Sequence, residues 1–411
     1  MTTKATPILQ QERADVLDGL RGFALLGILL ANSAVFSLYA FQSPNSLKSY
    51  STASADRILF FLSHVLVEGK FYSIFSLLFG IGFSIIFLRS KNKGKNGLLV
   101  FYRRLFILLL FGLCHSLLLW DGDILFFYAL AGMLLPLFRN TGNKTLLWLV
   151  IILLVSPIAF DVLKIISNGK WNIATSFLVK AMAIDKEIGI DGLYAGNWLI
   201  THDTYTDILK WSQSGFWWSW YLRLDSNRIV KVFAMFLLGL YVGRNELYLH
   251  LSTYKTLLER VRKLGFMIGL PAGIAFAWFA SDKKSIPQPA GIWDTITYFL
   301  NVAPLALAYA ATIALWYVNG KFQKTLSLLQ PVGRMALTNY IMQSVMGVTI
   351  YYGIGFGLGG KFGPAGYMPI AIILFIFQVV FSNWWFTYFN YGPLEWIWRQ
   401  LTYWKRLTLK K

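Results

Sequence analysis

Near its N-terminus the chain holds an uncharged apolar run that is long enough to cross a membrane. Residues 23–41 contain no Asp, Glu, Lys or Arg, and about 20 such residues in a helix span the roughly 30 Å of hydrocarbon in a bilayer. Asp18 and Arg21 precede the run, and Asn32 lies inside it. Charged and amide groups in a spanning helix are costly and usually face the interior of a bundle. The segment therefore predicts a membrane protein whose first helix lines a polar region inside a helix bundle.

The composition extends this prediction to the whole chain. Of the 411 residues, 56% are hydrophobic and only 14% are charged, whereas soluble domains are roughly 25% charged. We predict an all-α, polytopic transmembrane helix bundle that forms one integral membrane domain over residues 1–411. It has about ten spans by apolar length. The predicted spans are 18–41, 58–89, 104–120, 123–138, 146–167, 229–243, 264–280, 294–318, 334–356 and 367–390.

Basic residues gather in alternate short loops, and this pattern predicts the orientation. The net charge is +19, and Lys and Arg in short loops mark the cytoplasmic side of a membrane protein. With an even number of spans, the N- and C-termini are both expected to be cytoplasmic, with residues 391–411 as a basic cytoplasmic tail. Residues 168–228 become an extracytoplasmic loop. Its aromatic cluster at residues 216–221 suits an interfacial helix or stacking on a sugar.

Several function classes are disfavoured by what the sequence contains. Orientation bias explains the positive charge, so we expect no nucleic-acid partner. The single cysteine, Cys114, excludes an internal disulfide, and the four histidines have no metal-ligand spacing, so we expect no metal site. We find no nucleotide-binding fingerprint and expect no tightly bound cofactor.

One candidate site interrupts the predicted span 58–89. His64 and Glu68 are four residues apart and Lys70 follows them, so one helix face presents a carboxylate beside an imidazole, a common general-base arrangement. The alternative is an outer-surface turn between two helical pieces. Lys70 is a candidate for lining a substrate site.

A second candidate pairs His115 with Asp123. Arg104 and His115 fall on one helix face, and the residues 121–123, Asp-Gly-Asp, turn the chain back at the predicted outer surface. A carboxylate from this turn can reach His115, which then acts as a base for an outer-side nucleophile. The alternative is a buried histidine bonded to a backbone carbonyl, with a tight turn that caps the next helix.

A third candidate follows Arg334 near the predicted cytoplasmic face. Asn339 and Gln343 share a helix face, with Thr338 and Ser344 beside them. Interhelical hydrogen bonds explain part of this pattern. The density of polar side chains over ten residues also predicts a lined cavity.

The chain resembles a known family at several motifs. The stretches that carry the resemblance are 17–32, 69–82, 103–105, 122–125, 236–244, 333–344 and 392–399. They resemble the YeiB-like family of bacterial multi-span membrane proteins, which is defined by a domain of unknown function. The first-helix pattern is also similar to that of transmembrane acyltransferases such as heparan-alpha-glucosaminide N-acetyltransferase. The resemblance implies a bacterial cytoplasmic membrane location and a bundle in which cytoplasmic acyl-CoA acylates an acceptor on the far side.

These observations lead to one main hypothesis and two alternatives. In the main one, an acyltransferase moves an acyl group from cytoplasmic acyl-CoA to an extracytoplasmic glycan or lipid. Its Arg21, Arg104 and Arg334 bind the donor phosphates, Asp18 orients Arg21, and Asn32 lines the route. His115 with Asp123 deprotonates the acceptor, and His64 with Glu68 is the rival base. The first alternative is a transporter or channel for a small polar or amphipathic substrate. The second is a non-enzymatic factor that binds lipid or peptide. Membrane lipids are expected partners. The sequence leaves open whether the chain forms a homo-oligomer.

Overall fold

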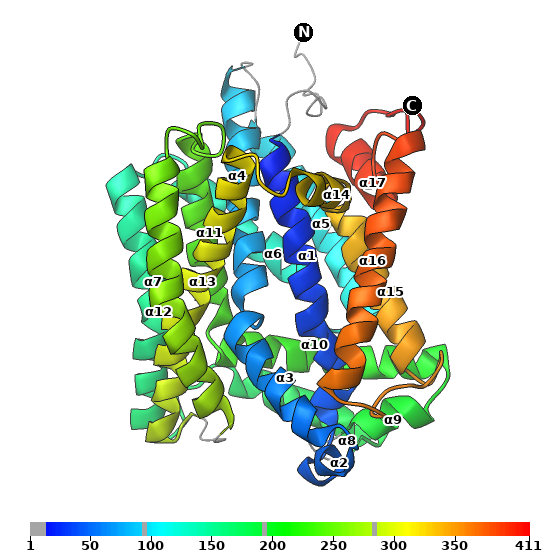
Figure 1. Cartoon of the computed structure of the whole chain (residues 1–411). Helices are drawn as coiled ribbons and strands as arrows, with labels where there is room; N and C mark the ends of the chain where they lie inside the picture. The colour runs from blue at the N-terminus through cyan, green and yellow to red at the C-terminus, as the bar shows by residue number, and fades with distance from the viewer. Residues whose placement is uncertain (1–13, 93–96, 191–194, 282–285) are drawn as a thin grey trace.

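The computed structural model describes residues 14–92, 97–190, 195–281 and 286–411, and in these residues the protein is an all-helical bundle (Figure 1). The helices are α1 (Asp15–Phe36), α2 (Pro44–Ser49), α3 (Ala53–Leu66), α4 (Lys70–Asn92), α5 (Gly97–Leu118), α6 (Leu125–Gly132), α7 (Asn143–Ile166), α8 (Thr175–Ile188), α9 (Gly196–Thr201), α10 (Tyr205–Asp225), α11 (Arg228–Arg244), α12 (Lys255–Ser281), α13 (Ile292–Val318), α14 (Gln323–Arg334), α15 (Ala336–Tyr351), α16 (Pro364–Tyr388) and α17 (Pro393–Tyr403). The all-α prediction is confirmed.

Seven segments of the described chain are long and apolar enough to cross a membrane. They are Asp15–Phe41, Ala53–Leu88, Gly97–Leu118, Asn143–Ile166, Lys255–Ala280, Pro289–Val318 and Pro364–Tyr388. Helices α10 and α11 make an eighth candidate only as a broken pair, bent by 70°. Three of the predicted spans correspond to shorter pieces: 123–138 to α6 and the 3₁₀ turn after it, 229–243 to α11, and 334–356 to the 16-residue α15. The number of about ten stays a prediction.

The interruption predicted inside 58–89 is present as a break between α3 and α4. Gly69 has φ +83° there, a left-handed conformation that glycine adopts without a steric penalty. A Cβ on Gly69 would also lie 2.6 Å from Tyr298 Oη. Lys70 is completely buried, and its ammonium donates to the carbonyl of His64 at 2.6 Å. The broken end of α3 is therefore satisfied by a side chain instead of water.

Helices α1 and α14 approach closely because small residues lie at their crossing. A Cβ on Gly22 would lie 2.2 Å from the carbonyl oxygen of Leu329, and one on Gly333 would lie 1.9 Å from that of Asp18. Small residues at helix crossings let backbones pack closely in membranes. This contact brings the end of α14, with Arg334, onto the start of α1.

The segment 168–228 is largely helical, since α8, α9 and α10 occupy much of it. Its aromatic cluster is part of α10, which lies across the lower end of the bundle in Figure 1. The tail 391–411 is also folded. Its helix α17 packs on α5, where Trp398 donates from Nε1 to the carbonyl of Arg104 at 3.0 Å, and the backbone N–H of Lys411 donates to the carbonyl of Tyr388 at 3.0 Å.

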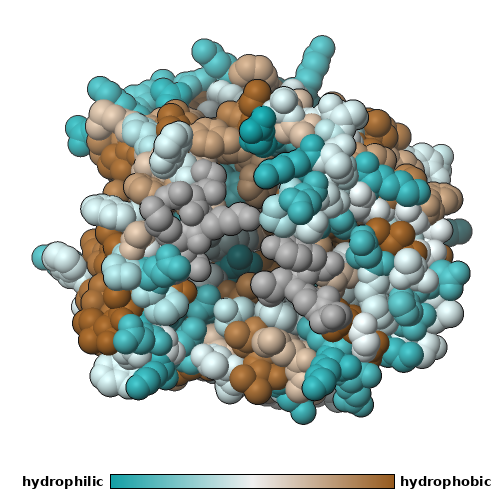
Figure 2. Space-filling model, turned by 90° about the horizontal axis from the view of Figure 1, so that it is seen from below, coloured by the Kyte–Doolittle hydropathy of each residue, from teal (hydrophilic) through white to brown (hydrophobic). Residues whose placement is uncertain are grey.

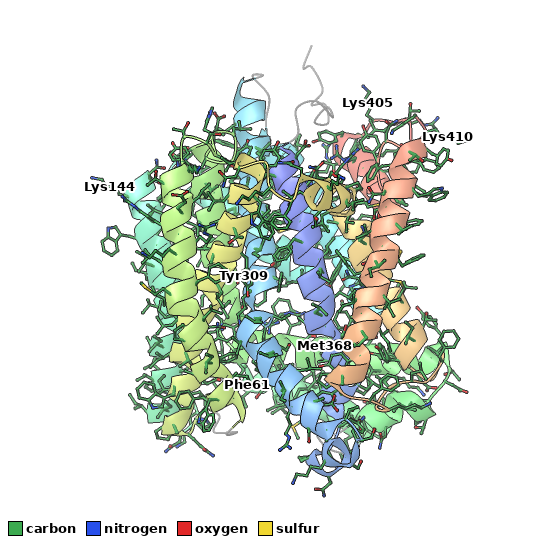
Figure 3. The ribbon with its side chains drawn as sticks, viewed as in Figure 1. Phe61, Lys144, Tyr309, Met368, Lys405 and Lys410 are labelled. Atoms are coloured by element: carbon green, nitrogen blue, oxygen red, sulfur yellow. The ribbon has the colours of Figure 1, made fainter. Side chains whose placement is uncertain are left out.

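The start of α1 and the C-terminus lie at the same end of the bundle, at the top of Figure 1. Lys144, Lys405 and Lys410 lie at this end, and Phe61 and Met368 lie in the opposite half (Figure 3). Seen from that opposite end, the molecule is hollowed near its centre, and hydrophilic residues show in the hollow (Figure 2).

Candidate active site

His115, Asp123 and Ser344 form a buried chain of hydrogen bonds between α5, the α5–α6 turn and α15. His115 Nδ1 lies 2.8 Å from Asp123 Oδ2, and Nε2 lies 2.9 Å from Ser344 Oγ. The His115 and Asp123 side chains are each 1% exposed, and Ser344 is completely buried. The structure therefore brings together the predicted pair and adds a hydroxyl from a residue 229 positions away.

The roles of the two imidazole nitrogens follow from their partners. An ionised carboxylate only accepts hydrogen bonds, so Nδ1 carries the proton that it shares with Asp123. The opposite nitrogen is then the acceptor, and Ser344 donates to it. This is the arrangement that Ser-His-Asp hydrolases use to activate a serine.

Asp123 is fixed by the fold around it. Its Oδ1 accepts from the backbone N–H of Phe126 at 2.7 Å, which caps the start of α6. Its backbone carbonyl accepts from the guanidinium of Arg223, a buried residue of α10. A Cβ on Gly112 would lie 2.1 Å from the backbone nitrogen of Phe126, so the glycine lets the turn approach α5.

The rival pair His64 and Glu68 is also formed, with His64 Nε2 3.1 Å from Glu68 Oε2. The second nitrogen of His64, Nδ1, lies 2.9 Å from the carbonyl oxygen of Phe60. Both nitrogens thus face oxygen acceptors, and neither is free to take a proton from a substrate. The Glu68 side chain is 43% exposed. The geometry favours His115 over His64 as a base.

The predicted arginines gather at the opposite end, where α1, α5, α14 and α17 meet. We call Arg21, Arg104, Arg334 and Arg399 the arginine cluster. Arg21 pairs with Asp18, and Arg104 lies within electrostatic range of Arg21 and Arg399. The guanidinium of Arg104 stacks 3.9 Å from the Trp398 ring. Arg334 is in range of Arg399, and its buried Nε has no hydrogen-bond partner among the described residues. The cluster offers guanidinium donors to an anion.

A buried polar column along α15 lies between these two groups. Asn339 donates to the carbonyl of Val332 at 3.1 Å and to Ser382 at 3.0 Å, and Gln343 donates to Gln378 at 3.0 Å. These bonds tie α15 to α14 and α16, as interhelical packing requires. Nevertheless, Asn339 Oδ1 and Gln343 Oε1 are buried without a hydrogen bond in the part of the chain that the structure describes.

Comparison with known proteins gives the family. The family described as "Protein of unknown function (DUF418)" matches residues 242–405. The "Uncharacterized protein YxaH" of Bacillus subtilis (strain 168) is 34% identical over 97% of this chain and 96% of its own length. The chain belongs to the DUF418 family. The "Uncharacterized protein YeiB" of Escherichia coli (strain K12) is 28% identical, covering 95% of this chain and 96% of its own length.

This DUF418 chain is thus a multi-span membrane protein with bacterial relatives. A third, the "Uncharacterized 39.9 kDa protein in amylase 3'region" of Bacillus acidopullulyticus, is 28% identical over 97% of the chain and 96% of its own length. These names carry no activity, so residue roles in this DUF418 member rest on geometry.

Two residues of the candidate site in this DUF418 member were not selected from the sequence. Ser344 was visible only as part of a polar stretch, and nothing in its neighbourhood indicates His115 as its partner. Glu395 binds the start of α15, since its carboxylate accepts from the N–H of Leu337 at 2.7 Å and from the Thr338 hydroxyl at 2.6 Å. One signal in the sequence could have indicated Glu395: it is the single acidic residue in the largely apolar stretch 392–399.

Proposed function

We propose that this protein is a transmembrane acyltransferase of the bacterial cytoplasmic membrane, with both termini in the cytoplasm. It would move an acyl group from cytoplasmic acyl-CoA to a hydroxyl of an extracytoplasmic glycan or lipid. The observation that carries the proposal is the Asp123–His115–Ser344 chain, in which one imidazole nitrogen is held as a donor and the other as an acceptor. The orientation is supported by Lys144, Lys405 and Lys410 at the end where α1 begins (Figure 3).

In this proposal Ser344 is the nucleophile and His115 is the general base. Ser344 Oγ attacks the thioester carbonyl while Nε2 of His115 takes the hydroxyl proton, and Asp123 stabilises the imidazolium. The C–S bond breaks, and the thiol of CoA leaves with that proton. The acceptor hydroxyl then gives its proton to His115 and attacks the serine ester, which returns Ser344 to its hydroxyl form.

The arginine cluster is the proposed site for the donor phosphates, because planar guanidinium groups bind phosphate through paired hydrogen bonds. Ala336 and Ser344 are eight positions apart on α15, which places Ser344 about 12 Å along the helix from its start beside Arg334. The unbonded amide oxygens of Asn339 and Gln343 lie on this stretch. They are acceptors for the amide N–H groups of a CoA thioester arm.

Proteoliposomes of the full chain supplied with acyl-CoA and an envelope extract test the proposal. We expect CoA thiol release that disappears in H115A and S344A. Mass spectrometry of the wild-type chain should find an acyl group on the peptide that contains Ser344. The matched control is S84A, because Ser84 is also buried, and among the described residues its hydroxyl bonds only to the carbonyl of Ile81 in its own helix. Thiol release that persists in S344A but stops in H115A would point to direct transfer without a serine ester. If the wild-type chain releases no CoA thiol with any acceptor, the acyltransferase proposal is rejected.

One observation favours a transporter as the second candidate. Helices α3 and α4 are separated by a break, and α10 and α11 meet at 70°. Discontinuous helices are typical of substrate sites near the membrane midplane. Substrate flux in the same vesicles without thiol release would select this candidate.

A further inference from the structure

Helix α17 is the one helix in the described residues that packs on both of the helices that carry the His115–Ser344 pair. His115 belongs to α5 and Ser344 to α15. Helix α5 packs on α4, α6, α10 and α17, whereas α15 packs on α1, α14, α16 and α17. Near the pair itself, the N–H of Ile124 donates to Tyr340 Oη at 3.1 Å and links the α5–α6 turn to α15. At the opposite end of the two helices, the connection is made by α17.

The contact of α17 with α5 consists of directional bonds. Trp398 donates from Nε1 to the carbonyl of Arg104 at 3.0 Å, and the guanidinium of Arg104 lies 3.9 Å from the Trp398 ring. Arg103 donates to the carbonyl of Thr402 at 3.2 Å. Hydrogen bonds weaken steeply when their distance or angle changes, so these contacts define where α17 lies along α5.

The contact of α17 with α15 is made by one carboxylate. Glu395 Oε1 accepts from the backbone N–H of Leu337 at 2.7 Å and of Thr338 at 3.1 Å, and Oε2 accepts from the Thr338 hydroxyl at 2.6 Å. That hydroxyl accepts in turn from the backbone N–H of Leu394 at 3.1 Å. The first N–H groups of a helix have no partner inside it, and bonds from them to a carboxylate are charge-assisted and strong. The start of α15 is therefore fixed on α17.

Each of these attachment points is connected to the pair by one continuous helix. Ser344 follows Thr338 by six positions, which is about 9 Å along α15. His115 follows Arg104 by eleven positions, which is about 17 Å along α5. A displacement of either helix relative to α17 is thus a displacement of its residue of the pair. A misplacement of about 1 Å costs an enzyme roughly a hundredfold in rate.

We propose that α17 positions the His115–Ser344 pair, with Glu395 and Trp398 as the positioning residues. By holding α15 and α5 together at one end, they bring Ser344 Oγ to 2.9 Å from His115 Nε2. The effect on rate rests on the proposed acyl transfer, whereas the effect on the hydrogen bond of the pair does not. Helix α17 also carries Arg399 of the arginine cluster, which the substitutions below leave in place.

Three variants remove or restore single bonds of α17. W398F removes the indole N–H and keeps a ring under Arg104, and E395A removes the acceptor at the start of α15. E395Q keeps an amide oxygen for the two backbone N–H groups. The matched control is W396F, because the indole of Trp396 donates to the carbonyl of Leu407 in the tail at 2.7 Å and holds neither α5 nor α15.

Acyl transfer in proteoliposomes is the first measurement. We expect kcat to fall by about tenfold to a hundredfold in W398F and E395A, with KM for acyl-CoA unchanged because the arginine cluster is intact. E395Q should recover most of the rate, and W396F should equal the wild type. A fall in W396F as large as that in W398F would assign the effect to general loosening of the tail and overturn the positioning role.

Nitrogen-15 spectra of histidine-labelled protein in detergent are the second measurement, and they need no activity. S344A provides the reference for a His115 whose Nε2 has lost its hydroxyl donor. We expect the Nε2 signal to move toward this reference in W398F and E395A and to stay in place in W396F. Wild-type signals in both W398F and E395A would overturn the proposal. If the signals move but the wild type transfers no acyl group, the positioning role stands and the proposed function fails. Gel filtration shows which variants are folded and enter the comparison.

Discussion

The substitution of Asp123 by asparagine is the sharpest perturbation of the Asp123–His115–Ser344 chain, because it changes the histidine tautomer while keeping the size and shape of the side chain. Asp123 accepts two hydrogen bonds, from the N–H of Phe126 at 2.7 Å and from His115 at 2.8 Å. In D123N the amide oxygen must stay with Phe126, since an NH₂ group cannot accept from a backbone N–H. The amide NH₂ then faces Nδ1 of His115 and makes that nitrogen the acceptor.

The proton of His115 consequently moves to Nε2. This nitrogen then points an N–H at Ser344 and can no longer take the proton of the serine hydroxyl. The side chains of His115 and Asp123 are 1% exposed, so solvent does not restore the original tautomer. General-base assistance is worth about 10²–10⁴ in rate, which corresponds to a barrier higher by about 2.7–5.4 kcal/mol. The free energy of unfolding should fall by only about 1 kcal/mol, because a charge-assisted bond becomes a neutral one.

Two measurements check this reasoning. Acyl transfer in proteoliposomes should fall by the stated factor in D123N and stay near wild type in D121N, which changes the other carboxylate of the same turn. Nitrogen-15 spectra of a histidine-labelled sample should show one histidine changing tautomer, a tractable assignment because the chain has four histidines. If D123N transfers acyl groups as fast as D121N, the assigned roles of the two imidazole nitrogens are wrong.

Three further predictions concern stability and the rival base. E395A removes the acceptor of two backbone N–H groups at the start of α15 and should cost about 1–3 kcal/mol, seen as a lower thermal midpoint in detergent, whereas E259A on an exposed face of α12 should not. G333A places a Cβ 1.9 Å from the carbonyl oxygen of Asp18 and should destabilise the α1–α14 crossing by about 1–3 kcal/mol; an unchanged midpoint would contradict the close approach. H64A should leave the acyl-transfer rate unchanged, because both of its ring nitrogens face oxygen acceptors, and a loss of rate would restore His64 as the base.

Local chemistry made some features predictable from the sequence. The helix break at Gly69 follows from charged residues inside an apolar run, and the pairs Asp18–Arg21, His64–Glu68 and His115–Asp123 follow from helical or turn spacing. Each of these depends on residues within eight positions of one another. Sequence spacing fixes such contacts because one helix or one turn holds both partners.

Contacts between distant helices were not predictable in this way. Ser344 meets His115 only because the fold brings one residue of α15 within hydrogen-bond distance of α5. The folded tail shows the same limit. The sequence predicts a basic cytoplasmic tail over residues 391–411, and it does not indicate that the indole of Trp398 ties α17 to α5 through the carbonyl of Arg104. Apolar periodicity predicts that a helix packs, and leaves open which helix it contacts.

The Glu395 contact with α15 has a consequence for biosynthesis. Glu395 is 57 residues downstream of Thr338, and a ribosome adds roughly 5–20 residues per second. The first backbone N–H groups of α15 therefore wait about 3–11 s for their carboxylate partner after they have been synthesised. During that interval Ser344 belongs to a helix that the remainder of the protein has not yet fixed. Assembly of the hydroxyl with its histidine is thus completed only when the last helix emerges, so a chain that ends before residue 395 would lack an ordered site.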